Sequence, residues 1–240
     1  MQNYIREIYI HPETIREDSY LKNIPVISSL ESLSFDTPVT FFVGENGSGK
    51  STLLNAIARA YGFNKEGGTR NYNFSTYEEQ EELSQAITLV RGIHKPEYAY
   101  FFRAETFYNV ATMEQMYARE GNRRSNEYHL ESHGEAFLHL FTSFTQASGL
   151  YLMDEPEAAL SPQRQLSLLH AMHEAVRNDS QFIIVTHSPV LLGYPEADIY
   201  SFDEVSLKKI RYEETDSYQI TKLFLINREQ VLRNLFEEEK

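Results

Sequence analysis

A glycine-rich segment, Gly44-Glu45-Asn46-Gly47-Ser48-Gly49-Lys50-Ser51, carries the clearest chemistry in the sequence. It fits the pattern G-x-x-x-x-G-K-[ST], and it follows an apolar run and opens a helical pattern. Glycines in such a loop let backbone N–H groups surround phosphate oxygens, the lysine reaches the β and γ phosphates, and the serine hydroxyl holds Mg²⁺. We therefore predict a nucleotide-binding site made of Gly44, Asn46, Gly47, Ser48, Gly49, Lys50, Ser51 and Thr52.

Two acidic residues, Asp154 and Glu155, end a second apolar run that spans Leu150 to Met153. If this run is a parallel strand, both acids lie at the carboxyl edge of the sheet, beside the phosphate loop. Asp154 suits a Mg²⁺ contact, because a hard cation prefers carboxylate oxygen. Glu155 suits the base that polarises the attacking water. The competing interpretation, two solvated acids at a strand end, is less favoured in a chain that also carries a phosphate loop.

A histidine, His187, follows a third apolar run, Phe182 to Thr186. A single histidine is usually a hydrogen-bonded structural residue. At the end of a core strand beside a nucleotide site, a contact with the γ-phosphate is the better interpretation. We therefore predict that His187 takes part in catalysis with Glu155.

The segment Ser132-His133-Gly134-Glu135 precedes a helical pattern rich in phenylalanine. By itself it is a capping box, in which Ser132 and Glu135 satisfy backbone donors without any ligand. It also lies 22 residues (154 minus 132) before Asp154. This order and spacing are those of the signature motif ahead of the Walker B strand in ABC ATPases.

Taken together, these motifs resemble the ABC-ATPase superfamily over roughly the whole chain. The resemblance implies ATP and Mg²⁺ as cofactors, hydrolysis of ATP to ADP and phosphate, and an ATP-dependent homodimer. It also implies that Ser132, Gly134 and Glu135 act in trans, on the γ-phosphate held by the other subunit. Ser51 and Asp154 are the expected metal contacts.

The residues that make up these motifs resemble those of the SMC, RecF and OLD branch of the ABC ATPases. Within that branch they resemble small stand-alone bacterial ATPases, which share Arg103-Ala104-Glu105. Transporter ATPases usually carry L-S-G-G-Q, whereas this chain has Ser132-His133-Gly134-Glu135 in that place. The resemblance suggests that Glu105 takes the role of the glutamine loop near Mg²⁺. Pairing of Arg103 with Glu105 in a purely structural role is an equal alternative.

The alternation of apolar runs and helical patterns predicts an α/β P-loop fold with a mixed, largely parallel sheet. We expect one domain over residues 1–240, with an antiparallel edge sheet at the N-terminus and a small helical lid lobe over about 104–135. The expected strands are Tyr4 to Ile10, Ser28 to Phe35, Val39 to Val43, Tyr98 to Phe102, Leu150 to Met153, Phe182 to Thr186 and Ile199 to Phe202. The expected helices are Lys50 to Tyr61, Glu135 to Ala147, Pro162 to Arg177 and Arg228 to Phe236.

The composition limits the partners of this chain. A formal net charge of −13 opposes a general nucleic-acid surface, although a repair or defence ATPase bound to nucleic acid stays an alternative. The chain has no cysteine, and no stretch is long and apolar enough for membrane insertion, so we expect a cytoplasmic protein. The leading expectation is an ATPase whose dimer closes on ATP and transmits that motion to an unknown protein partner. The second expectation is the motor subunit of a membrane transporter.

Overall fold

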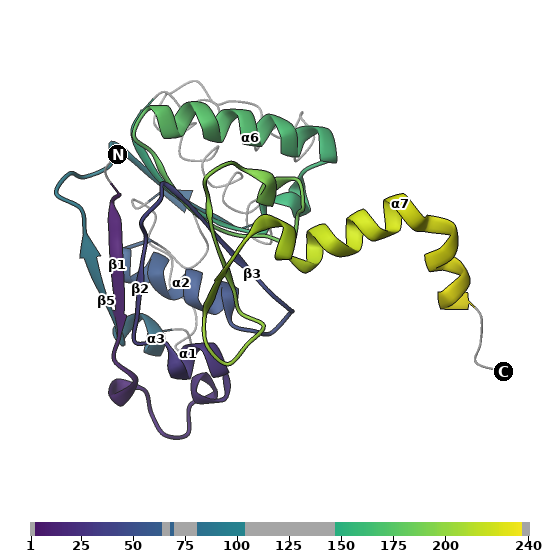
Figure 1. Cartoon of the computed structure of the whole chain (residues 1–240). Helices are drawn as coiled ribbons and strands as arrows, with labels where there is room; N and C mark the ends of the chain where they lie inside the picture. The colour runs from purple at the N-terminus through teal and green to yellow at the C-terminus, as the bar shows by residue number, and fades with distance from the viewer. Residues whose placement is uncertain (1–2, 64–67, 70–80, 104–146, 237–240) are drawn as a thin grey trace, which may run out of the picture.

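The larger of the two β-sheets in the described residues forms the centre of the protein (Figure 1). A computed structural model describes residues 3–63, 68–69, 81–103 and 147–236. In these residues the larger sheet contains, in order across it, β10 (Lys208–Ile210), β9 (Asp198–Ser201), β3 (Val39–Val43), β8 (Gln181–Val185), β7 (Gly149–Asp154), β6 (Tyr98–Arg103) and β4 (Gly68–Thr69).

The five central strands of this sheet, from β9 to β6, are mutually parallel, while β10 and β4 pair antiparallel at its two edges. Strands β3, β7 and β8 are buried along their whole length, as expected for continuous apolar runs in a sheet covered on both faces. All five strands predicted for the core are present, within a residue or so of their expected ends. The mixed, largely parallel sheet is therefore confirmed.

The second sheet is antiparallel and contains β2 (Ser32–Ser34), β1 (Ile5–Ile10) and β5 (Ile87–Arg91) in the described residues. The antiparallel sheet expected at the N-terminus is therefore present, and it is separate from the larger sheet. The expected strand Ser28 to Phe35 was too long, because helix α1 (Pro25–Ser29) occupies its start. Pro25 stands at the first helical position, where its fixed φ favours a helix.

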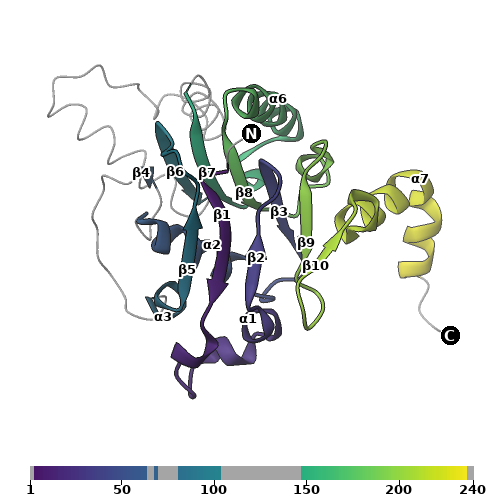
Figure 2. The ribbon, with the colours of Figure 1, turned by 60° about the vertical axis from the view of Figure 1, so that its left-hand side comes forward.

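Helix α2 (Lys50–Tyr61) lies between the two sheets, and the short helix α3 (Glu81–Gln85) packs beside it (Figure 2). Buried side chains of α2, such as Leu53 and Ile57, share one apolar cluster with Ile8 of β1 and Ile183 of β8. This packing fixes the start of α2 against the end of β3.

The other face of the larger sheet is covered by helix α6 (Pro162–Arg177), whose Leu168 and Met172 pack on the sheet. Ser161 caps this helix by accepting a hydrogen bond from Arg164 N at 3.4 Å, and Pro162 takes the first helical position. Of the four predicted helices, α2 and α6 have the predicted bounds.

The buried side chain of Gln181, at the start of β8, joins the two sheets. Its Oε1 accepts hydrogen bonds from the backbone N–H groups of Tyr4 and Ile5, at 2.8 and 2.9 Å. Its Nε2 donates to the carbonyl of Ile5 at 2.8 Å. A buried amide that meets these partners fixes the register of β1 over the larger sheet.

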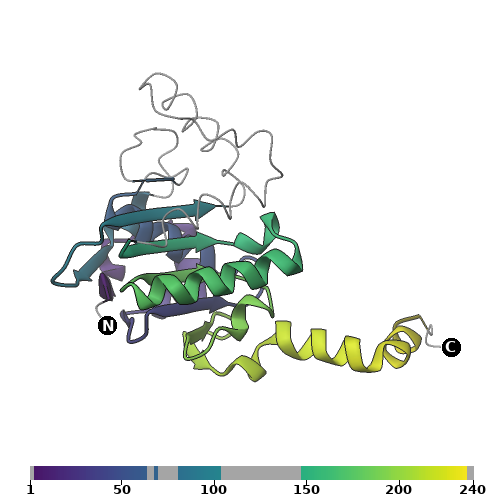
Figure 3. The same ribbon diagram turned by 90° about the horizontal axis from the view of Figure 1, so that it is seen from above.

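The C-terminal helix α7 (Asp216–Phe236) projects away from the body of the protein (Figures 1 and 3). It begins twelve residues (228 minus 216) before the expected Arg228, and its backbone leaves helical geometry at Asn227. Short 3₁₀ segments connect the other elements: η1 (Pro12–Thr14), η2 (Tyr20–Asn23), η4 (Pro156–Ala159), η5 (Leu191–Gly193) and η6 (Tyr212–Glu214). Within the described residues, no helix is long and apolar enough to cross a membrane.

Two expected features, the lid lobe over 104–135 and nearly all of the helix Glu135 to Ala147, lie outside the described residues.

Candidate active site

The glycine-rich loop connects β3 to α2, the position that its sequence predicted. Gly44, Gly47 and Gly49 have φ angles of 137°, 83° and 103°, which favour glycine. A Cβ on Gly49 would lie 2.7 Å from the Ile24 side chain, so a larger residue would force Ile24 or the loop to shift. A Cβ on Gly47 would meet nothing within 4 Å. The loop is thus held by close packing at Gly49 and is open at Gly47, as a cradle for a ligand must be.

The Lys50 side chain folds back over this loop. Its Nζ donates hydrogen bonds to the carbonyls of Gly44 at 2.7 Å and Glu45 at 2.6 Å. Burial lowers the pKa of Lys50, and the nearby carboxylates of Asp203 and Glu155 oppose that shift. A desolvated ammonium group held inside the loop is suited to phosphate oxygens, which offer it more negative charge than the carbonyls do.

Ser51 and Asp154 meet directly. The Ser51 hydroxyl donates a hydrogen bond to Asp154 Oδ1 at 2.7 Å, and Arg103 Nε lies 3.9 Å from Asp154 Oδ2. A hydroxyl and a carboxylate are hard oxygen ligands of the kind that Mg²⁺ takes, so these residues fit the ion. The described residues contain no cluster of three or more His, Asp or Glu side chains able to hold a metal. Mg²⁺ bound here would therefore depend on the phosphates of the nucleotide for its remaining ligands.

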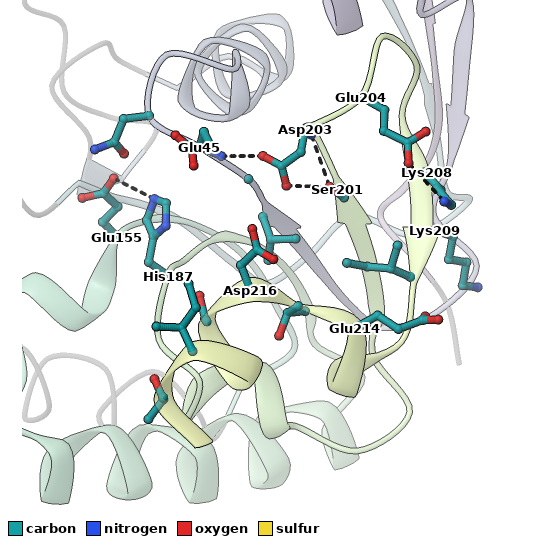
Figure 4. A pocket seen from close by; sticks show the side chains of 18 residues that line it. Glu45, Glu155, His187, Ser201, Asp203, Glu204, Lys208, Lys209, Glu214 and Asp216 are labelled. Carbon is teal, nitrogen blue, oxygen red and sulfur yellow. Dashed lines mark hydrogen bonds and ion pairs between the residues drawn. The ribbon is translucent and has the colours of Figure 1, made fainter. Parts of the chain in front are cut away.

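Glu155 and His187 come from neighbouring strands and approach each other across the carboxyl edge of the sheet (Figure 4). His187 Nε2 lies 3.9 Å from Glu155 Oε1, and both side chains are less than half exposed, at 40% and 46%. The backbone of Glu155 is left-handed, with φ of 51°, an uncommon conformation for a residue other than glycine. This conformation turns the chain sharply after β7, and the pair borders the same cleft as the phosphate loop.

Glu157 holds the backbone of His187 in place. Its Oε1 accepts a hydrogen bond of 2.6 Å from the backbone N–H of His187. Burial raises the pKa of the Glu157 carboxyl, although that hydrogen bond acts in the opposite direction. Sequence analysis gave Glu157 no role, because nothing in a linear pattern links it to a residue 30 positions away.

The loop after His187 is tied to α6. The Ser188 hydroxyl donates to Gln165 Oε1 at 2.5 Å and accepts from the backbone N–H groups of Val190 and Leu191. Gln165 Nε2 in turn donates to the carbonyl of Leu160 at 3.2 Å. These contacts hold the turn that presents His187 to the cleft.

Asp203, which sequence analysis also missed, lies just after β9 and against the phosphate loop. Its Oδ1 accepts a hydrogen bond of 2.7 Å from the backbone N–H of Glu45, and its Oδ2 accepts one of 2.8 Å from the Ser201 hydroxyl. A Cβ on Gly44 would lie 2.8 Å from Asp203 Oδ1. In the sequence, Asp203 is marked only as an acid just after an apolar run. Its contact with the phosphate loop could not be predicted, because it depends on β9 being next to β3.

An open cleft of about 860 Å³ borders the site (Figure 4). The phosphate loop, Glu155 and His187 line one side of it, and residues at the start of α7, including Asp216 and Ile220, line the other. Its acidic lining residues are Glu45, Glu155, Asp203, Glu204, Glu214 and Asp216.

Several predicted site residues lie outside the described residues, namely Ser132, Gly134, Glu135 and Glu105. Their roles stay predictions. Among the described residues, the structure brings together Lys50, Ser51, Asp154, Glu155 and His187, all at the carboxyl edge of the larger sheet.

Comparison with known proteins places this arrangement in a family. Residues 20–229 match the model of a family described as "AAA domain". A protein of Pyrococcus furiosus named "Putative ABC transporter ATP-binding protein" is 25% identical over 236 residues, which cover 84% of this chain and 88% of that protein.

Solved structures also match this chain. The cbiO1 protein of Clostridium perfringens, part of the ABC transporter complex cbiONQ, matches with a TM-score of 0.50 and 15% identity, covering 98% of this chain and all (100%) of that one. The SMC head domain of Thermotoga maritima matches with a TM-score of 0.47 and 16% identity over 87% of this chain and 98% of that one. Because the family model spans most of the sequence and the phosphate loop, Asp154 and Glu155 occupy their expected places, the chain belongs to this AAA domain family and is a P-loop ATPase of the ABC class.

Proposed function

We propose that this protein binds Mg-ATP, closes as a homodimer around two ATP molecules, hydrolyses them and passes the resulting motion to a protein partner. The observation that carries the proposal is the contact between Ser51 and Asp154, because it joins the phosphate loop to the acidic end of β7. The resemblance of the motifs and the ABC-class fold support the dimer.

In this proposal the residues of one chain have distinct tasks. Backbone N–H groups of the loop and the Lys50 ammonium bind the phosphates, while Ser51 and Asp154 hold Mg²⁺. The ion, when bound, neutralises charge that develops on the phosphate oxygens. Glu155 accepts a proton from the attacking water, and His187, 3.9 Å from Glu155, contacts the γ-phosphate.

The second chain is proposed to complete the site. Ser132 and Gly134 of the signature segment would face the γ-phosphate bound by the first chain, so that neither chain hydrolyses ATP alone. Glu105 is proposed to stand near Mg²⁺ and the attacking water.

The motor subunit of a membrane transporter is the second candidate, because the Pyrococcus furiosus relative carries that kind of name. Recovery of the protein with a native membrane fraction would favour it. Recovery with a soluble protein in a trapped ATP state would favour the first proposal.

A paired experiment tests the proposed mechanism. Glu155→Gln keeps the shape of the side chain but loses the base, so ATP should bind, dimers should accumulate and turnover should fall by about two to four orders of magnitude. Ser132→Arg places bulk at the shared face, so ATP binding should persist and dimers should not form. Size-exclusion chromatography with light scattering, with and without Mg-ATP, measures both. Normal hydrolysis by Ser132→Arg, or a monomeric ATP-bound Glu155→Gln, would refute the proposal.

A further inference from the structure

Helix α7 exposes more apolar surface than any other element in the described part of the chain. Seven of its large apolar side chains are between 40% and 75% exposed. They are Ile220, Leu223, Phe224, Leu225, Ile226, Leu235 and Phe236. None of the residues in α7 is buried, and the helix extends from the body with no described element packed along its outer half (Figures 1 and 3). Exposed apolar side chains in this number mark an interaction site.

The amount of surface suits a macromolecular partner. Seven side chains of this size, 40% to 75% exposed, present apolar area on the order of the roughly 800 Å² that each partner buries in a standard protein interface. A small ligand could not cover a projecting element of this size, in which two helical segments meet at Asn227 and together span 21 residues.

The position of α7 indicates which partner covers it. Ser217, Ile220 and Thr221, in the first two turns of α7, line the same cleft as the phosphate loop and Glu155. Phe224 follows Ile220 by four residues and Thr221 by three, so it continues the same face of the helix outward. The apolar face of α7 is therefore continuous with the surface on which, in the proposed function, a second chain closes.

The charge of α7 points the same way. The helix carries three basic side chains, Lys222, Arg228 and Arg233, and two acidic ones, Asp216 and Glu229. The whole chain has a formal net charge of −13, so α7 is mildly basic on a strongly acidic protein. A second copy would present acidic side chains to it, such as those that line the cleft.

We infer that α7 is a dimerisation arm that packs its Ile220 and Phe224 face against a second copy of this chain when ATP closes the dimer. This inference rests on the proposed function. Ile220 and Thr221 place the start of the arm at the rim of the nucleotide cleft. Binding of ATP is therefore coupled to packing of α7 against the second copy. The arm adds apolar area to an interface that would otherwise be built around polar nucleotide contacts.

The first test measures the dissociation constant of the ATP-bound dimer by analytical ultracentrifugation, in a Glu155→Gln background with Mg-ATP. Leu223→Gln combined with Phe224→Gln removes apolar area from the face that begins at Ile220 while keeping good helix formers. The dissociation constant should rise at least about tenfold, because such residues dominate binding energy in interfaces. Because α7 buries none of its residues, the melting temperature of the monomer should not change. Leu225→Gln, about 140° around the helix from Ile220, makes the same kind of change off this face; it is the matched control and should leave the dissociation constant within about twofold.

A second measurement shows whether the helix itself enters the interface. The chain has no cysteine, so Phe224→Cys and Lys222→Cys each accept a single nitroxide label. Mg-ATP should immobilise the label at position 224 and leave the label at 222, on the opposite side of the helix, mobile. A mobile label at 224 in a dimer that forms normally would show that α7 serves another protein, and would overturn the inference alone. Absence of any ATP-bound dimer, with α7 intact, would overturn the proposed function as well.

Discussion

The Asp203 carboxylate accepts a 2.7 Å hydrogen bond from the backbone N–H of Glu45, and so links the end of β9 to the phosphate loop. The two residues are 158 positions apart in the sequence. The contact holds the first turn of the loop in the conformation that the left-handed Gly44 requires, with the carboxylate packed where a Cβ would otherwise stand.

This contact predicts opposite results for two substitutions at one position. Asp203→Ala removes the acceptor for Glu45 N, so affinity for Mg-ATP should fall by roughly tenfold. Asp203→Asn keeps an acceptor oxygen and removes a negative charge near the phosphates, so affinity should be retained or rise. Isothermal titration calorimetry measures both. Equal losses in the two variants would mean that charge, rather than the hydrogen bond, is what the loop needs. Glu204→Ala, at the next position, is the control.

Lys50→Ala should abolish nucleotide binding. The substitution removes the main positive charge that faces the β and γ phosphates, and charge-assisted hydrogen bonds are the strong ones in such sites. Fluorescence anisotropy with a labelled ATP analogue measures the loss. Lys22 is exposed, so the control variant Lys22→Ala should bind the ATP analogue with normal affinity. Near-native affinity in Lys50→Ala would show that the phosphates bind elsewhere.

Removal of Mg²⁺ should weaken ATP binding strongly. Six acidic side chains line the cleft, and free ATP brings further negative charge to it. Titration with ATP in the presence of a chelator should give a much weaker affinity than with Mg-ATP, and the deficit should shrink as salt screens the repulsion. Equal affinities with and without Mg²⁺ would contradict the assignment of Ser51 and Asp154 as metal contacts.

Glu157 predicts a dependence of stability on pH. Its folded pKa is raised by burial above the ordinary 4.5, so the folded chain holds a proton that the unfolded chain has already released. The free energy of unfolding therefore falls as pH rises from about 4.5 toward the folded pKa. Glu157→Gln stays neutral and can still accept from His187 N. Its melting temperature relative to wild type should increase across that range, whereas the exposed Glu229→Gln should show no such trend. A constant difference would refute the assignment.

Nucleic acid should bind weakly and with strong salt dependence. The formal net charge of −13 repels a phosphate backbone, whatever local basic groups exist. Electrophoretic mobility shifts at low and at physiological salt measure this. Tight binding of DNA or RNA at physiological salt would favour a repair or defence ATPase over the proposed function.

The sequence alone determined the local parts of this protein. The phosphate loop, the helix that it opens and the cap at Ser161 depend on neighbouring residues, whose types set backbone angles and local hydrogen bonds. The core strands could be predicted because fully buried parallel strands are continuous apolar runs, and the places of Asp154, Glu155 and His187 followed from the ends of those strands.

Only the tertiary structure decided what depends on strand order and on sheet packing. Asp203 reaches the loop because β9 pairs with β3, and Gln181 binds β1 because a second sheet lies across α2. Neither contact leaves a pattern in the sequence, since the partners are more than 150 residues apart. The start and exposure of α7 were also hidden, because an apolar helical pattern looks the same whether its face packs on its own chain or projects to meet another.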